Sequence, residues 1–151
     1  MGAVAVTPAM VGVADRHARR RNYLCGVSAG INGGAAIYID TNGLAQLATS
    51  ADTTHCQFAG IAIPTKNSAY AAGIGQAVDV VQWGEVEGFS LSGVAYWGFV
   101  YLADDGTFAT TAGTKTVRIG QCVPTSDKDS SGNPRKLLMV MVPFGNVALI
   151  T

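Results

Sequence analysis

Charged residues are scarce in this chain. Only 13% of its 151 residues are Asp, Glu, Lys or Arg, with ten of each sign and a formal net charge of zero. A neutral chain has no overall field that would attract nucleic acid or an anionic membrane. We therefore expect no membrane partner and do not expect a nucleic-acid partner.

Residues that commonly hold metals are also few, with two histidines and three cysteines in the whole chain. Cys25, Cys56 and Cys122 lack the paired spacing of a zinc site, and an odd number of cysteines does not make a complete disulfide framework. No apolar run approaches the roughly 18 residues that a membrane-spanning helix needs. We expect reduced cysteines, no metal site and no cofactor.

One motif has the form of the nucleophile elbow of serine hydrolases, Gly-x-Ser-x-Gly at 26–30. That elbow needs a strand before the serine and a helix after it, which exposes the serine on a strained turn. The following residues, Ile-Asn-Gly-Gly at 31–34, are a poor helix start. A triad in chain order would also compress Ser28, an acid and His55 into one short segment. We therefore predict that the protein is not an enzyme and has no catalytic residues.

The chain is rich in glycine (19 residues) and in apolar residues (48%). From Ile31 onward, short runs of Val, Ile, Tyr and Phe alternate with Gly, Asn, Asp and Ser, a pattern that predicts many short strands. The polar segment 126–134 is expected to be an exposed connection outside any strand. The expected strands are 35–40, 44–48, 57–63, 76–83, 85–89, 98–103, 107–111, 116–123 and 136–142.

A short sequence pattern occurs twice. Residues 34–43 (GAAIYIDTNG) match 97–106 (WGFVYLADDG) at an offset of 63, and 58–64 (FAGIAIP) match 118–124 (RIGQCVP) at an offset of 60. Gly43 and Gly106 each end a turn sequence that favours a hairpin, because glycine accepts positive φ. The pattern predicts an all-β fold: a small barrel or sandwich of short antiparallel strands, built from a duplicated β-hairpin-plus-strand unit.

Residues 1–28 differ from the rest and are expected to form an extended N-terminal arm, with 29–151 as a single β-domain. The arm carries four of the ten basic residues: Arg16, Arg19, Arg20 and Arg21. We interpret this cluster as a docking arm for an acidic protein surface, because arginine suits such contacts. A solvated tail and a weak, salt-sensitive nucleic-acid contact are the alternatives.

Four aromatic residues stand at strand positions in or near the repeat: Tyr38, Tyr101, Trp83 and Trp97. We predict that they pack in the core, and the alternative is a platform that stacks sugars or bases.

The repeated unit resembles the capsid cement, or decoration, proteins of tailed phages. The resemblance covers residues 31–142, whereas the N-terminal region and the insertion 127–134 depart from the family pattern. The segments that carry it are IYIDTNG (37–43), QFAGIA (57–62), VDVVQWGEV (78–86), GFVYL (98–102) and VRIG (117–120).

The resemblance implies a structural virion protein without cofactor, made in the host cytoplasm and placed on the capsid exterior. There it would bridge neighbouring subunits of the major capsid protein and stabilise the expanded head, often as a homotrimer. A carbohydrate- or receptor-binding β-module of a head fibre or tail is the alternative. Exposure of Trp83, Trp97 or Tyr101 to solvent would favour that alternative.

Overall fold

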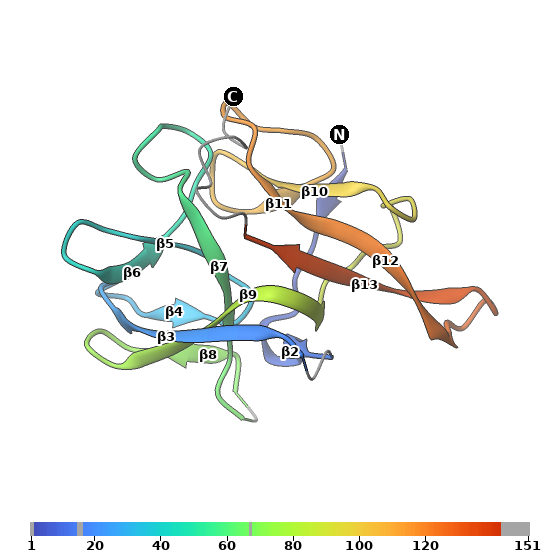
Figure 1. Ribbon diagram of the computed structural model, residues 1–151, viewed down its shortest axis with the longest axis horizontal. Coiled ribbons are helices and arrows are strands. Elements are labelled where there is room, and N and C mark those ends of the chain that lie inside the picture. Colours follow the sequence, from blue (N-terminus) through green and yellow to red (C-terminus); the bar gives the residue numbers. More distant parts are fainter. Residues whose placement is uncertain (1, 15–16, 67, 143–151) are drawn as a thin grey trace.

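The computed structural model describes residues 2–14, 17–66 and 68–142. They form an all-β fold (Figure 1), in which eleven strands make one mixed sheet and two make a small second sheet. The large sheet contains β1 (Ala3–Val4), β2 (Gly12–Val13), β3 (Arg19–Cys25), β5 (Ala36–Ile39), β6 (Leu44–Leu47), β7 (Phe58–Ile63), β9 (Ala77–Glu87), β10 (Phe99–Leu102), β11 (Phe108–Ala109), β12 (Arg118–Lys128) and β13 (Pro134–Met141). The small sheet pairs β4 (Ile31–Asn32) with β8 (Tyr70–Ala72), and a 3-10 turn, η1, covers Pro8–Met10.

Five strands close into a small barrel. The strand β3 pairs with β6 in parallel, and antiparallel pairings then run from β6 to β5, β7, β9 and back to β3. The barrel encloses one of two hydrophobic clusters, in which Ile37, Ala62, Val78 and Val80 have no exposed surface. The expected barrel of short strands is therefore present, with one parallel pair among the antiparallel ones.

A second unit repeats most of this arrangement with β10, β11, β12, β13 and the second half of β9. In this unit β11 and β9 do not pair directly. The N-terminal segment lies between them, since β1 pairs with β11 and β2 pairs with β9. The larger hydrophobic cluster fills the space between this unit and the outside of the first barrel.

The strand pairings confirm the duplication. In the first unit Ile37 is opposite Gly60, and in the second Val100 is opposite Gly120, with a register shift after each pair. Both turns also have the same backbone hydrogen bonds. The Gly43 N–H donates to the Asp40 carbonyl, and the equivalent N–H of Gly106 donates to the Ala103 carbonyl, each at 3.0 Å.

The two equivalent glycines allow close approach of the next strand. A Cβ at Gly60 would lie 2.5 Å from the Val81 carbonyl oxygen, and one at Gly120 would lie 2.1 Å from that of Met139. Gly60 also has a positive φ of 147°. Glycine at these positions thus lets β7 approach β9 and β12 approach β13.

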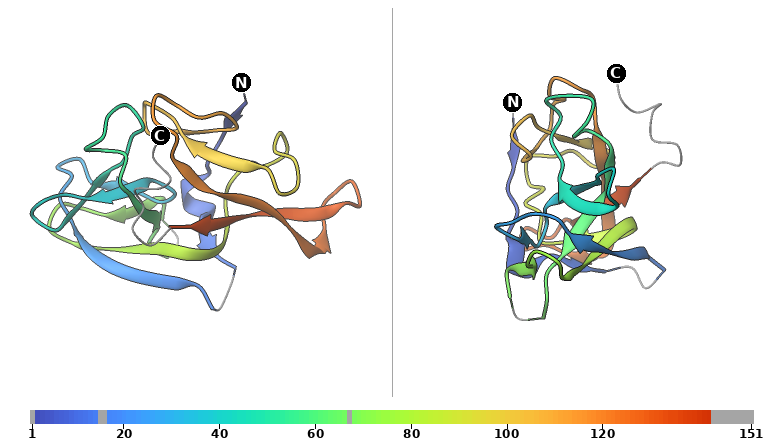
Figure 2. Two further views of the ribbon diagram at one scale, coloured as in Figure 1. Left: turned by 45° about the horizontal axis from the view of Figure 1, so that its top comes forward. Right: turned by 90° about the vertical axis from the view of Figure 1, so that its left-hand side faces the viewer.

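The N-terminal region differs from the expected arm. Its described residues belong to the β-domain: residues 2–13, with β1, η1 and β2, run along one side of it (Figure 2), and β3 is a strand of the barrel. Val4 and Val11 are each 4% exposed in the larger cluster, and Cys25 is buried in the smaller one. Burial of these apolar side chains and pairing of β1, β2 and β3 account for the difference.

Two expected boundaries are also wrong. The strand β9 runs without a break through Gly84 where two strands were expected, and its pairing with β13 continues across Gly84 despite a φ of 135° there. Residues 126–128 belong to β12, although 126–134 was expected to lie outside any strand. The turn that follows is closed by Asp129, whose carboxylate accepts hydrogen bonds from the N–H groups of Ser131 and Asn133. The resulting β12–β13 hairpin projects from the body of the molecule (Figures 1 and 2).

Candidate functional site

The arginine cluster lies mainly on β3, where Arg19, Arg20 and Arg21 are exposed. Arg16 lies outside the described residues. Arg20 forms an ion pair with Asp79 on β9, and its side-chain hydrogen bond to that carboxylate raises the pKa of the guanidinium. Arg21 lies over the ring of Tyr23, with 5.7 Å between the guanidinium carbon and the ring centroid. The three described arginines therefore form a basic strand on the domain surface.

The aromatic residues in or near the repeat differ in their exposure to solvent. Tyr38 is buried at 9% exposure, as expected, and its ring contacts that of His55 edge-on. Trp83 and Trp97 are 47% and 61% exposed, so the prediction of core packing is wrong for both tryptophans. Each lies where the chain presents its side chain away from the core, and strand position alone did not predict this.

One face of the second unit gathers large apolar side chains at the surface. Residues opposite each other on neighbouring strands share a face, and the row Phe99, Gln121, Met139 and Glu85 crosses β10, β12, β13 and β9 in that order. Figure 1 shows these four strands side by side. We call this surface the aromatic face; its large side chains are Trp83, Phe99, Tyr101, Arg118, Met139 and Met141, all exposed or half-buried.

Contacts within the aromatic face hold its side chains in place. The guanidinium of Arg118 lies 4.4 Å from the centroid of the Phe99 ring, which is a cation–π distance. The rings of Phe99 and Tyr101 meet edge-on at 6.4 Å between centroids. These contacts order a surface of rings and methionines in which Trp83 and Arg118 are exposed and the other four side chains are half-buried.

Trp97 stands beside the aromatic face on a strained turn. The Gly98 N–H donates to the Ala95 carbonyl, which closes a β-turn with Trp97 as its third residue, at a positive φ of 68°. The Trp97 N–H donates to the Cys122 carbonyl, and its own carbonyl accepts a hydrogen bond from Gln121 Nε2, both at 2.7 Å. Since Gln121 belongs to the aromatic face, this bond ties the turn to that face.

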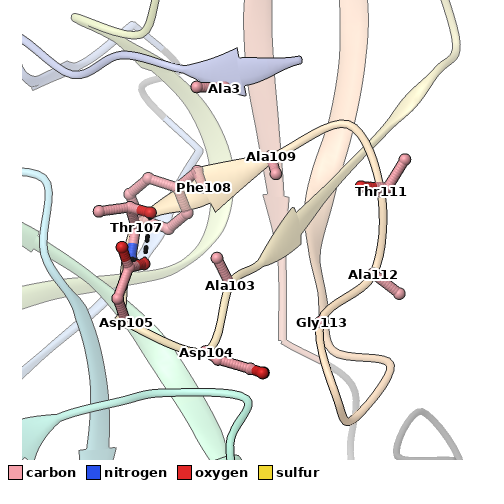
Figure 3. A pocket seen from close by; sticks show the side chains of 10 residues that line it. All are labelled: Ala3, Ala103, Asp104, Asp105, Thr107, Phe108, Ala109, Thr111, Ala112 and Gly113. Carbon is pink, nitrogen blue, oxygen red and sulfur yellow. Dashed lines mark hydrogen bonds between the residues drawn. The ribbon is translucent and has the colours of Figure 1, made fainter. Parts of the chain in front are cut away.

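A shallow hollow of about 460 Å³ lies beside the β10–β11 hairpin (Figure 3). Its lining is mainly small and apolar: Ala3, Ala103, Phe108, Ala109 and Ala112, with Asp104 and Asp105 at one side. Figure 3 shows the Asp105 carboxylate directed toward Thr107, which donates to it from both its backbone N–H and its hydroxyl.

The carboxylates of Asp104 and Asp105, beside the hollow, both accept hydrogen bonds from neighbouring turn residues. Hydrogen bonds from the Thr114 hydroxyl and N–H, and from Ser50, lower the pKa of Asp104. Those from Thr107 lower the pKa of Asp105. A general acid needs a raised pKa near the working pH. These two groups have the opposite shift, and they hold turns in place.

Ser28 and His55, which a serine-hydrolase triad would need together, make no contact with each other. Ser28 is exposed on the turn between β3 and β4, and within the described parts of the chain it has no hydrogen bond to a histidine or carboxylate. His55 Nδ1 instead lies 2.7 Å from Asp52, whose pKa is lowered chiefly by the His55 N–H. Burial raises the pKa of the neighbouring Cys56 thiol, which disfavours the reactive thiolate.

Among residues 2–14, 17–66 and 68–142, no three His, Cys, Asp or Glu side chains gather as metal ligands. The same residues contain no helix that is long and apolar enough to cross a membrane. Comparisons with protein-family models, curated proteins and solved structures found no match to this chain.

Proposed function

We propose that this chain is a structural virion protein that decorates the exterior of an expanded phage capsid. It stabilises the shell by bridging neighbouring subunits of the major capsid protein, and it acts without catalysis or a cofactor. It is made in the host cytoplasm and works as a homo-oligomer, which the resemblance to cement proteins implies is a trimer.

The observation that carries this proposal is the exposure of large apolar side chains at two separate parts of a charge-poor surface. Ile74, in the connection between β8 and β9, and Trp97, in the connection between β9 and β10, are each 61% exposed. The two connections lie in opposite halves of the molecule along its long axis (Figure 1). Leu24, 52% exposed, is close to the first of them, since the Gly75 N–H donates to the Cys25 carbonyl.

Two separated apolar contacts are what a bridging protein needs. Each contact alone buries little area and is weak, but the second forms at high effective concentration once the first is made. Low surface charge also favours packing against other proteins, because it reduces repulsion and desolvation cost. A decoration subunit can thus clamp two neighbours with contacts of modest individual strength.

The test is co-sedimentation with expanded capsids that lack decoration protein, scoring bound copies per major capsid subunit and the temperature of shell disruption. We expect saturation at a simple fixed ratio and a higher disruption temperature. Ile74→Ser and Trp97→Ser should each weaken binding at least about tenfold, whereas Ser130→Ala, in the exposed β12–β13 turn, should not. Binding that never saturates, or saturation without stabilisation, would rule the proposal out.

The exposure of Trp83 and Trp97 favours a second candidate, a carbohydrate- or receptor-binding module. A solvent-exposed indole offers a flat apolar surface with a polar edge, which suits stacking against a sugar ring. Titration of tryptophan emission against a glycan panel tests this candidate. A saturable change that is lost in Trp97→Asn would support it, and no change with any glycan would exclude it for that panel.

A further inference from the structure

We propose that the aromatic face is a contact between two copies of this chain. The copies would be related by a two-fold axis that runs parallel to the strands, between β12 and β13. This inference goes beyond capsid decoration, because it concerns the purified protein alone and does not depend on a shell.

The first observation is the conformation of Trp97. Nine glycines occupy the other positive-φ positions of the described chain, and Trp97 is the one residue there that is not glycine. A left-handed conformation costs a residue with a side chain of this size about 1–2 kcal/mol relative to glycine. The indole is mostly exposed, so burial in the single chain repays only part of that cost. Strained residues persist where the surrounding structure holds them, and they cluster at functional sites; here hydrogen bonds to Cys122 and Gln121 hold the turn that leaves the indole exposed beside the aromatic face.

The second observation is the composition of the aromatic face. Tryptophan, tyrosine, phenylalanine, methionine and arginine are the residue types enriched at protein–protein contacts. The six large side chains of the aromatic face are all of these types. The face also follows four neighbouring strands, and the hollows beside β1 and the β10–β11 hairpin are lined by other residues. A broad surface of rings and thioethers fits another protein surface better than a small ligand.

The third observation identifies the partner as a second copy, because the charges of the face complement themselves. Arg118 places its guanidinium over Phe99, which is the β10 end of the row that runs from Phe99 through Gln121 and Met139 to Glu85. Glu85 stands at the β9 end of the same row, opposite Met139. A two-fold axis along the strands, midway along the row, places β10 of one copy over β9 of the other. Arg118 of each copy then meets Glu85 of its partner, and Gln121 meets Met139.

Nothing in the charge of the chain opposes this pairing. The net charge is zero, so two copies do not repel each other as a whole. Two reciprocal Arg118–Glu85 pairs would fix the register of the contact, since charged pairs chiefly contribute specificity at interfaces. The apolar rings and methionines would supply most of the affinity.

The test uses two charge-reversal variants of the full chain, Arg118→Glu and Glu85→Arg, examined by sedimentation velocity over a wide concentration range. We expect the unaltered protein to form an even-numbered oligomer, of two chains or six, relative to the 15.5 kDa chain. Each variant alone should associate at least about tenfold more weakly, because like charges would meet across the axis. An equimolar mixture of the two variants should associate again, because both pairs in the mixed dimer are then of opposite charge.

Recovery in the mixture is specific to a reciprocal contact between copies. Circular dichroism should show every variant folded. The proposal is overturned if the protein is a monomer or an isolated trimer at all concentrations, or if the mixture associates no better than either variant alone. One of these overturning results is expected if the same chain covers the aromatic face. The same holds if the aromatic face binds only an unrelated partner.

Discussion

The replacement Gly120→Ala should destabilise the fold through one identifiable contact. The added Cβ would lie 2.1 Å from the carbonyl oxygen and 2.9 Å from the carbonyl carbon of Met139. Those atoms belong to the backbone of β13, which pairs with β12 throughout this region. Relief of the overlap therefore requires the two strands to separate by more than 1 Å, since an ordinary contact begins near 3.4 Å.

The expected loss follows from that geometry. Insertion of a methyl group into a well-packed site costs about 1–3 kcal/mol, and separation of the strands weakens one or two backbone hydrogen bonds at about 1 kcal/mol each. We expect the free energy of unfolding to fall by about 3 kcal/mol. For a chain of this length that loss lowers Tm by about 6–12 °C.

Urea unfolding followed by circular dichroism measures the change, and Tm provides a second measurement. Gly12→Ala is the matched control, because a Cβ at this β2 position has no atom within 4 Å. Its unfolding free energy should differ from that of the unaltered protein by less than about 1 kcal/mol. If Gly120→Ala is as stable as this control, the close approach of β12 and β13 is not a constraint on the fold.

Three further predictions concern Trp97, Asp104 and the cysteines. Trp97→Gly should leave the free energy of unfolding, measured with urea, nearly unchanged. Relief of the left-handed strain and loss of the partly buried ring are each about 1–2 kcal/mol and opposite in sign. A fall of about 3–5 kcal/mol in that free energy would instead indicate a tryptophan packed in the core. Because the pKa of Asp104 is lowered in the folded protein, chiefly by Thr114, its contribution is present above the pKa of the unfolded chain and is lost as pH falls through the folded value. Stability measured from pH 6 to 3 should therefore fall less steeply in Asp104→Asn, and parallel curves would refute this. Burial raises the pKa of the Cys56 and Cys122 thiols, so both should resist iodoacetamide when folded and react in urea, as mass spectrometry would show.

The proposed two-fold contact and the proposed decoration role can be separated experimentally. The charge-reversal mixture needs only purified protein, whereas co-sedimentation needs shells. Loss of shell binding in Ile74→Ser with association between copies unchanged would assign the two ends of the molecule to different partners. Ile74 lies in the β8–β9 connection, far along the chain from the strands that carry Phe99 and Arg118.

Local sequence patterns determined several elements of this protein. The turns at Gly43 and Gly106 form as predicted, because positive φ at glycine is a local requirement that a few neighbouring residues satisfy. The duplication was also visible in the sequence, since Gly60 and Gly120 recur at matched positions, each as the third residue of its strand, β7 or β12. The all-β class follows from the same short apolar runs and turn residues.

Only the tertiary structure decided where the N-terminal region lies and which aromatic rings reach the surface. Strand β3, with exposed arginines and little alternation, becomes a strand because β9 and β6 supply its hydrogen-bonding partners. Strands β1 and β2 are two residues each and exist only through pairing with remote segments. Tyr38 is buried and Trp97 is exposed although both belong to the repeat, because strand register and turn geometry set side-chain direction. Pairing between distant segments has no local sequence signal, and it brought Arg118 and Glu85 onto one face.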